Sequence, residues 1–303
     1  MERTELRYPD YFYDADAKSG KGQRIYKWLF KIELGILIAA SICTFFIASD
    51  IVDQKALALV ILILFIIEIV IRLTIKFSDV HREWYYGRAI AESVKTSTWR
   101  YIMRAEPFDK DEDQDLMFEE MILAFYDSSE VPSSLKKKGP DFVCVTDQTT
   151  AIRSTSLEER KERYLTDRID DQRKWYSSKA EFNRKWHMAV SVTVISMYIL
   201  ALILSGYFIY NPVSIKLFSF FPIDLNIVSL LAVIATSFLA WSQLNRFKDL
   251  YYSYTAAENE IHKVKLKITP IQDEAIFSEF VADAENAFSR EHTMWMARKD
   301  SVS

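Results

Sequence analysis

Four long apolar runs constrain this chain more than any other feature of its sequence. They cover residues 28–48, 56–75, 188–210 and 222–241. A helix needs about 20 apolar residues to cross a bilayer core about 30 Å thick, so the third and fourth runs predict membrane-spanning helices. The first two are shorter or contain a charge, and each alone also suits a buried core helix. Because only the polar stretch 50–55 separates them, we interpret them as a second spanning pair joined by a tight hairpin.

The composition favours helices throughout the chain. Its 303 residues include only six Gly and seven Pro, which are too few breakers for a turn-rich β architecture. We therefore expect an all-α integral membrane protein with four transmembrane helices. They are paired into two helical hairpins whose long helical extensions lie in the cytosol.

The distribution of basic residues predicts the topology. The two short connectors between paired spans, 49–55 and 211–221, hold one lysine each, out of 38 Lys and Arg residues in the chain. Basic residues concentrate on the cytoplasmic side of membrane proteins. We expect a multi-pass protein of the inner membrane with both termini and the middle section in the cytosol, and no signal peptide.

An internal repeat relates the two hairpins. A shift of 166 residues places 56–75 on 222–241, Glu92 on Glu258 and Ile102 on Ile268 without gaps. Since both units enter and leave the membrane on the same side, this is a parallel repeat. The expected domains are a first two-helix membrane unit, a cytosolic helix with a linker, and a second two-helix membrane unit with C-terminal cytosolic helices. Their expected ranges are 1–110, 111–156 and 157–303.

The helical extensions of the two units differ in pattern. After the fourth run, a heptad-like stripe at spacings of three and four includes Leu244, Phe247, Tyr251, Tyr254, Ile261 and Ile268. The equivalent stripe in the first unit, 85–102, is more polar. In the charged helix before the third run, Trp175 and Tyr176 are expected to pack inward. The candidate contacts of the cytosolic helices are Trp99, Arg100, Asp171, Trp175, Tyr176, Tyr251 and Tyr254.

No pattern predicts an enzyme, a cofactor or a metal site. The four His residues are scattered without ligand spacing, and Cys43 and Cys144 lie in different surroundings far apart. No serine nucleophile elbow occurs. The net charge of −4 argues against a nucleic-acid partner. Ser19-Gly20-Lys21-Gly22 superficially resembles a phosphate loop but lacks its first glycine and the final hydroxyl residue, so we expect a flexible turn before the first helix.

Glu68 is the sharpest single candidate for function. It lies inside the second run, where a charge costs at least about 2.5 kcal/mol on insertion scales and usually faces the bundle or a water path. Either it forms a ring of carboxylates in an oligomer, which favours cations, or it pairs locally with Arg72 four residues on. Its repeat equivalent is Ile234. Glu92 and Glu258 match across the repeat, and we expect a shared structural role or, alternatively, a role in gating.

Several stretches of the cytosolic helices resemble a known family. They are AESVKTSTWR at 91–100, RAEPF at 104–108, and YLTDRIDDQRKWYSSKA at 164–180. These stretches resemble SLATT domains, the two-transmembrane effector domains associated with SMODS nucleotidyltransferases and SLOG nucleotide-binding domains. The resemblance covers both units, so most of the chain looks like two fused SLATT modules.

The resemblance implies an effector of a bacterial conflict system, such as antiviral defence. Such an effector acts as an oligomeric membrane pore or ion channel in the lipid bilayer. It is triggered by a nucleotide-sensing or nucleotide-producing partner. Because no such domain is recognisable in this chain, we expect the trigger to come from a separate protein or from the cytosolic helices themselves. The alternative is a membrane-anchored helical scaffold that recruits cytosolic partners through Tyr251 and Tyr254 without conducting ions. A small transporter is disfavoured because the spans lack Gly or Pro breaks.

Overall fold

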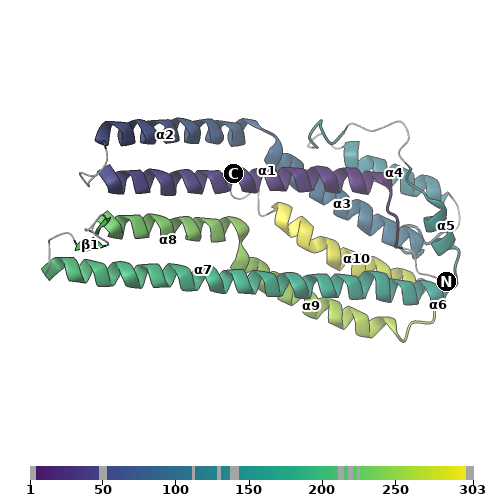
Figure 1. The fold of residues 1–303 in the computed structure, drawn as a ribbon. Coiled ribbons are helices and arrows are strands. Elements are labelled where there is room, and N and C mark those ends of the chain that lie inside the picture. The colour runs from purple at the N-terminus through teal and green to yellow at the C-terminus, as the bar shows by residue number, and fades with distance from the viewer. Residues whose placement is uncertain are drawn as a thin grey trace. The chain divides into compact units, whose positions relative to one another are not determined.

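A computed structural model describes residues 5–47, 53–110, 113–127, 131–136, 143–210, 215–217, 221–223 and 226–297. Helices dominate it (Figure 1). In chain order the elements are α1 (Asp10–Ile47), α2 (Gln54–Phe77), α3 (Val80–Ile102), α4 (Gln114–Asp127), α5 (Asp147–Arg153), α6 (Leu157–Arg163), the π-helix η1 (Tyr164–Asp170), α7 (Asp171–Tyr210), β1 (Ile215–Leu217), β2 (Phe221–Ile223), α8 (Asn226–Asn245), α9 (Phe247–Ile268) and α10 (Glu274–Ala297).

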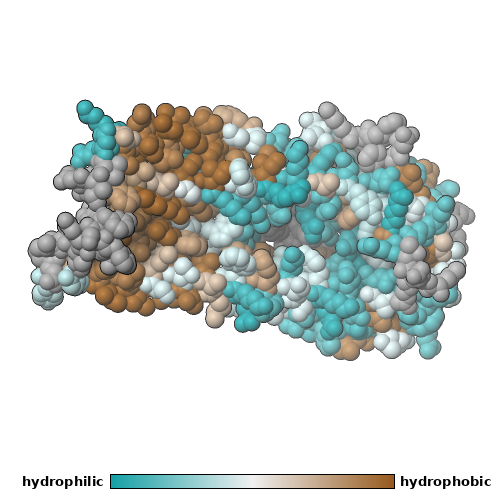
Figure 2. Space-filling view, viewed as in Figure 1, coloured by the Kyte–Doolittle hydropathy of each residue, from teal (hydrophilic) through white to brown (hydrophobic). Residues whose placement is uncertain are grey.

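The chain divides into two compact units, and each takes residues from both halves of the sequence. The head unit comprises 1–26, 79–175 and 257–303, and the membrane unit comprises 27–78 and 176–256. Apolar surface gathers over the membrane unit and hydrophilic surface over the head unit (Figure 2).

The membrane unit confirms the four predicted transmembrane helices. α1, α2, α7 and α8 each supply a stretch long and apolar enough to cross a bilayer. Most of their apolar side chains point outward, which suits contact with lipid. The interior is small, and Val190, Val194 and Ala235 form one of its cores.

The fourth spanning helix begins later than predicted. We expected helix from Pro222, whereas α8 begins at Asn226. Residues 221–223 form an extended strand instead, paired antiparallel with 215–217 so that Pro222 lies opposite Lys216. Proline suits the edge of such a short hairpin because it has no N–H to donate to a helix or a ladder.

The predicted turn at Ser19–Gly22 is wrong, because these residues lie in the interior of α1. A Cβ atom added at Gly22 would lie 2.8 Å from the carbonyl oxygen of Val80 and 3.0 Å from the backbone nitrogen of Trp84. Ser19 Oγ donates to the carbonyl oxygen of Trp84 at 2.8 Å. The small residues therefore let the start of α3 approach α1 closely, which is a packing role.

The helix boundaries repeat in register. α3 ends at Ile102 and α9 ends at Ile268, two positions related by the 166-residue shift. Each follows a break after its spanning helix, at 78–79 before α3 and at Arg246, which has φ 52°, before α9. The repeat seen in the sequence is thus a repeat of structural elements.

Candidate functional site

Three charged residues meet inside the membrane unit. Arg72 Nε lies 2.6 Å from Glu33 Oε1 and 3.6 Å from Glu68 Oε1. We call Glu33, Glu68 and Arg72 the membrane charge cluster. Arg72 is thus adjacent to Glu68, as one alternative predicted, but its closer partner is Glu33 on α1.

The membrane charge cluster is unbalanced and unevenly exposed. It contains two carboxylates and one guanidinium, and Glu68 Oε2 is buried without a hydrogen bond to any described residue. The Glu33 side chain is 2% exposed, whereas that of Arg72 is 64% exposed on the surface of the membrane unit. A charged group left on an apolar surface calls for water or for another protein surface as its neighbour.

Sequence reasoning missed Glu33 because it immediately precedes the charge-free stretch that begins at Leu34. The spacing of Glu33 and Glu68 from the hairpin turn indicates that they are neighbours. Glu33 lies 17 residues before Asp50 and Glu68 lies 18 residues after it. In an antiparallel hairpin, residues at equal distances from the turn lie at the same depth, so the two carboxylates are neighbours.

A second group of charges is buried in the head unit. Arg168 of η1 donates from Nε to Glu285 Oε1 at 2.8 Å and from Nη2 to Glu285 Oε2 at 2.6 Å. Tyr164 OH donates to the same carboxylate at 3.0 Å. All three residues are almost completely buried. The guanidinium also lies over the ring of Phe288, at 5.1 Å from its centroid.

The surroundings of this ion pair shift the pKa of several groups. Burial opposes the charge of Arg168, but the Glu285 carboxylate outweighs it and raises the pKa of the guanidinium. Burial raises the pKa of Tyr164 well above its usual range. It also raises the pKa of Tyr8, whose OH accepts from Trp99 Nε1 at 2.9 Å, to about 12. Burial and the charge of Arg168 lower the pKa of Lys95.

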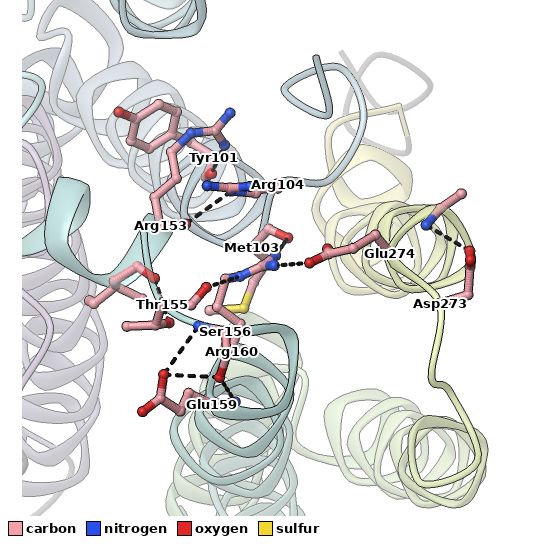
Figure 3. A network of polar contacts seen from close by, with 12 residues as sticks. Tyr101, Met103, Arg104, Arg153, Thr155, Ser156, Glu159, Arg160, Asp273 and Glu274 are labelled. Carbon is pink, nitrogen blue, oxygen red and sulfur yellow. Dashed lines mark hydrogen bonds and ion pairs between the residues drawn. The ribbon is translucent and has the colours of Figure 1, made fainter. Parts of the chain in front are cut away.

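A polar network holds the start of α10 to α6 and to the end of α3 (Figure 3). Arg160 donates to the carbonyl oxygen of Met103 at 2.9 Å and forms an ion pair with Glu274. Lys161 Nζ donates to the carbonyl oxygen of Ile271 at 2.6 Å. These charge-assisted bonds satisfy backbone carbonyls at helix ends.

The structure brings some predicted contact residues into the core of the head unit. Trp99 is 1% exposed and its ring lies 5.8 Å from that of Tyr164. Arg100 reaches α10, where it donates to Asn286 Oδ1 at 2.7 Å and to the carbonyl oxygen of Ala282 at 3.2 Å.

The other predicted contact residues lie on α7 and α9. Tyr176 is buried and contacts Tyr254, with the two rings tilted and their centroids 5.6 Å apart. Tyr251 contacts its neighbour Tyr252, with centroids 5.0 Å apart. Trp175 is exposed, so the inward packing predicted for it is wrong although that of Tyr176 is right. The remaining candidate, Asp171, is exposed at the first position of α7.

Glu92 and Glu258 do not share an interaction, although they match across the repeat. Glu92 pairs with Arg88 on the same helix at 2.6 Å, and Arg88 Nη1 lies 3.6 Å from Asp16. The repeat equivalent of Arg88 is Tyr254. Glu258 therefore has no arginine one turn before it, and it forms no ion pair with any residue that the structure describes.

The described residues include no group of three or more His, Cys, Asp or Glu side chains that could hold a metal ion. The candidate sites rest on charge contacts instead, and they are the membrane charge cluster and the buried charges of the head unit.

Comparisons with known proteins match the chain twice, once in each half. Residues 9–161 match a family model described as SMODS and SLOG-associating 2TM effector domain 3. Residues 164–295 match one described as SMODS and SLOG-associating 2TM effector domain 1. No curated protein and no solved structure matches the chain. SLATT domains are two-transmembrane effector domains of conflict systems, which agrees with the four spanning helices found here. The chain belongs to the SLATT family and is a multi-pass membrane protein built from two SLATT domains in tandem.

Proposed function

We propose that this protein is an effector of a bacterial conflict system that forms an oligomeric, ion-conducting pore in the inner membrane. A separate nucleotide-sensing protein triggers it through the cytosolic helices, and both termini lie in the cytosol. The proposal rests on one observation above all, which is the membrane charge cluster with its exposed arginine.

The physics of a charge in lipid carries the argument. Arg72 lies five residues before Phe77, the last residue of α2, so its cost in lipid is lower than the about 2.5–3.5 kcal/mol of an arginine at the centre of a spanning helix. The Arg72 side chain is 64% exposed in one protomer. Assembly of several copies around α2 relieves this cost, because each guanidinium then faces a water-filled axis or the adjacent copy. Since each copy contributes two carboxylates and one guanidinium, the axis carries net negative charge and favours cations.

The test is ion flux through liposomes that carry the purified full-length protein. We expect a low basal, cation-selective flux from the wild type without its trigger, and lower flux or weaker cation preference from Glu68→Gln and Glu33→Gln. Glu120→Gln, an exposed change on α4, is the matched control and leaves flux unchanged. A protein that is monomeric and impermeant under every trigger tried would overturn the proposal.

A second candidate function is a membrane-anchored scaffold that recruits cytosolic partners without conducting ions. It is favoured by the exposed side chains of Tyr252 and Leu266 on α9. Tyrosine is enriched at protein interfaces, because its ring is apolar while its hydroxyl can bond water or a partner. The scaffold predicts that Tyr252→Ala abolishes capture of a partner while membrane insertion is unchanged. Flux that depends on Glu68 argues against it.

A further inference from the structure

The C-terminal helix α10 crosses from one SLATT domain to the other. In sequence it belongs to the second domain, which matches residues 164–295. In the structure its main helix partner is α3 of the first domain, and the two lie side by side in the head unit (Figure 1). The face of α10 toward the core is built from Phe277, Val281, Ala284, Glu285 and Phe288.

Polar and charged groups make many of the contacts that hold α10 in this place. Arg100 of α3 donates to Asn286 at 2.7 Å. The backbone nitrogen of Glu106, just after α3, donates to Ser278 Oγ at 3.1 Å.

Glu285 is the central contact of α10. Both its oxygens accept from Arg168, and Tyr164 adds a third hydrogen bond. Arg168 Nη1 is buried without a hydrogen bond to any described residue, so the hydrogen bonds of the pair do not fully replace the water that the guanidinium loses on burial. An intact buried pair contributes little net stability, whereas loss of one partner leaves an uncompensated charge and is strongly destabilising. The pair therefore favours two states, fully docked or fully released.

The partners of Glu285 lie in a special backbone segment. Tyr164 and Arg168 belong to η1, a π-helix, which is a rare conformation that occurs mainly at functional sites. η1 begins where α6 ends and continues directly into α7, which carries the third membrane span. A change at Arg168 therefore acts on the cytosolic start of a spanning helix.

We propose that Tyr164, Arg168 and Glu285 form an inhibitory lock, which we call the Glu285 lock. In the locked state α10 stays docked on α3 and η1 is held rigid. When a trigger separates Glu285 from Arg168, α10 leaves α3 and η1 loosens together with the first turns of α7. The lock itself stands on the geometry of the head unit, and only its consequence for conduction rests on the proposed function.

Hydrogen exchange on the full-length protein in nanodiscs tests the lock. We expect Glu285→Gln to raise exchange in 274–288 by about 100-fold or more, because Arg168 then lacks its counter-charge. Exchange in 164–175 rises in parallel. The matched control is Glu279→Gln, an exposed change on the same helix, and it leaves both segments as in the wild type.

A double variant separates loss of the lock from general misfolding. In Arg168→Met with Glu285→Leu, apolar groups replace both charges, a change that is often neutral or stabilising for a buried pair. We expect α10 to dock again, with exchange in 274–288 back near the wild-type level. The lock would be overturned if exchange in Glu285→Gln were the same as in the wild type. It would also be overturned if exchange rose in 274–288 but not in 164–175.

Flux measured on the same samples distinguishes the lock from the pore. Flux that rises in Glu285→Gln and falls again in the double variant supports both. Coupled exchange of 274–288 and 164–175 without flux in any variant leaves the lock standing and contradicts the pore. If the wild type conducts ions and its flux does not change when α10 is released, the Glu285 lock has no inhibitory role.

Discussion

α3 and α9 occupy equivalent places in the two SLATT domains, yet they are buried to very different extents. α3 is covered along its second half, where 94 and 96–99 are all buried, whereas most of α9 beyond Phe247 is at least partly exposed. The reason lies in their neighbours, because α4, α5 and α10 all pack against α3. The tandem arrangement has thus made one extension the centre of the head unit and left its counterpart on the surface.

A repeat in sequence therefore does not imply a repeat in packing. The helix that follows α9 is α10, and it packs on α3 of the other domain. α9 keeps its register and length but not the covering helices. Substitutions at repeat-equivalent positions of α3 and α9 therefore measure how much the difference in burial contributes to stability.

The largest difference is expected at Trp99 and its equivalent, Lys265. Trp99→Ala removes a fully buried ring and should lower the free energy of unfolding by about 3–5 kcal/mol. Lys265 is 34% exposed and bonds Asp170 at 2.7 Å, so Lys265→Ala should lower it by less than about 1 kcal/mol. Both free energies are measured by denaturant unfolding of the head unit. The loss of helix is followed by far-UV circular dichroism, because this signal does not depend on the fluorescence of the tryptophan that is removed. Equal effects would mean that α3 and α9 are equally buried.

A smaller difference is expected at Gly87 and its equivalent, Ser253. A Cβ atom at Gly87 would lie 2.9 Å from the carbonyl oxygen of Ala15 and 3.1 Å from Ser19 Cβ. The crowding costs about 1–3 kcal/mol, offset by about 1 kcal/mol of better helix propensity. Gly87→Ala should thus lower thermal stability measurably, while Ser253→Ala stays within about 0.5 kcal/mol. A stabilised Gly87→Ala would show that α1 and α3 do not approach as closely as described.

The buried tyrosines around α3 make stability fall in alkali. The pKa of Tyr8 is raised to about 12, so between pH 10 and 12 the folded state keeps a proton that the unfolded state has lost. Stability is fully present below pH 10 and declines by at most about 1.4 kcal/mol per pH unit between pH 10 and 12 for this group. Tyr8→Phe should flatten the unfolding profile between pH 10 and 12. Tyr252→Phe on α9 serves as the control, and an equal flattening there would contradict the assignment.

The smallest difference is expected at Glu92 and Glu258. Glu92 pairs with Arg88 at 2.6 Å and is mostly buried, so Glu92→Gln should destabilise by about 0.5–1 kcal/mol. Glu258→Gln should have no measurable effect, because Tyr254 stands where the arginine would be. A double-mutant cycle with Arg88→Gln isolates the pair. A coupling energy near zero would show that the ion pair contributes nothing.

The candidate site was only partly predictable. Glu68 and Arg72 stood out because charges are rare in spanning helices, but Glu33 became evident as their partner only through the hairpin geometry. The pairing of Arg168 with Glu285 joins residues 117 positions apart. No local pattern predicts that these two charges pair, among the many others on the helices of the head unit.

The four spanning helices, the tandem SLATT organisation and the register of the repeat, in which Ile102 falls on Ile268, could all be predicted from the sequence. These features follow from the length of apolar runs and from breakers close by in the chain, which act locally. Which of the two extensions is buried depends on contacts between helices far apart in the chain. The stripe along α9 is the more apolar one in sequence, yet α3 became the core helix because α10 packs on it. The choice between two helices of the same register depends on long-range side-chain fit and on the buried charges of Arg168 and Glu285, which periodicity along one helix does not specify.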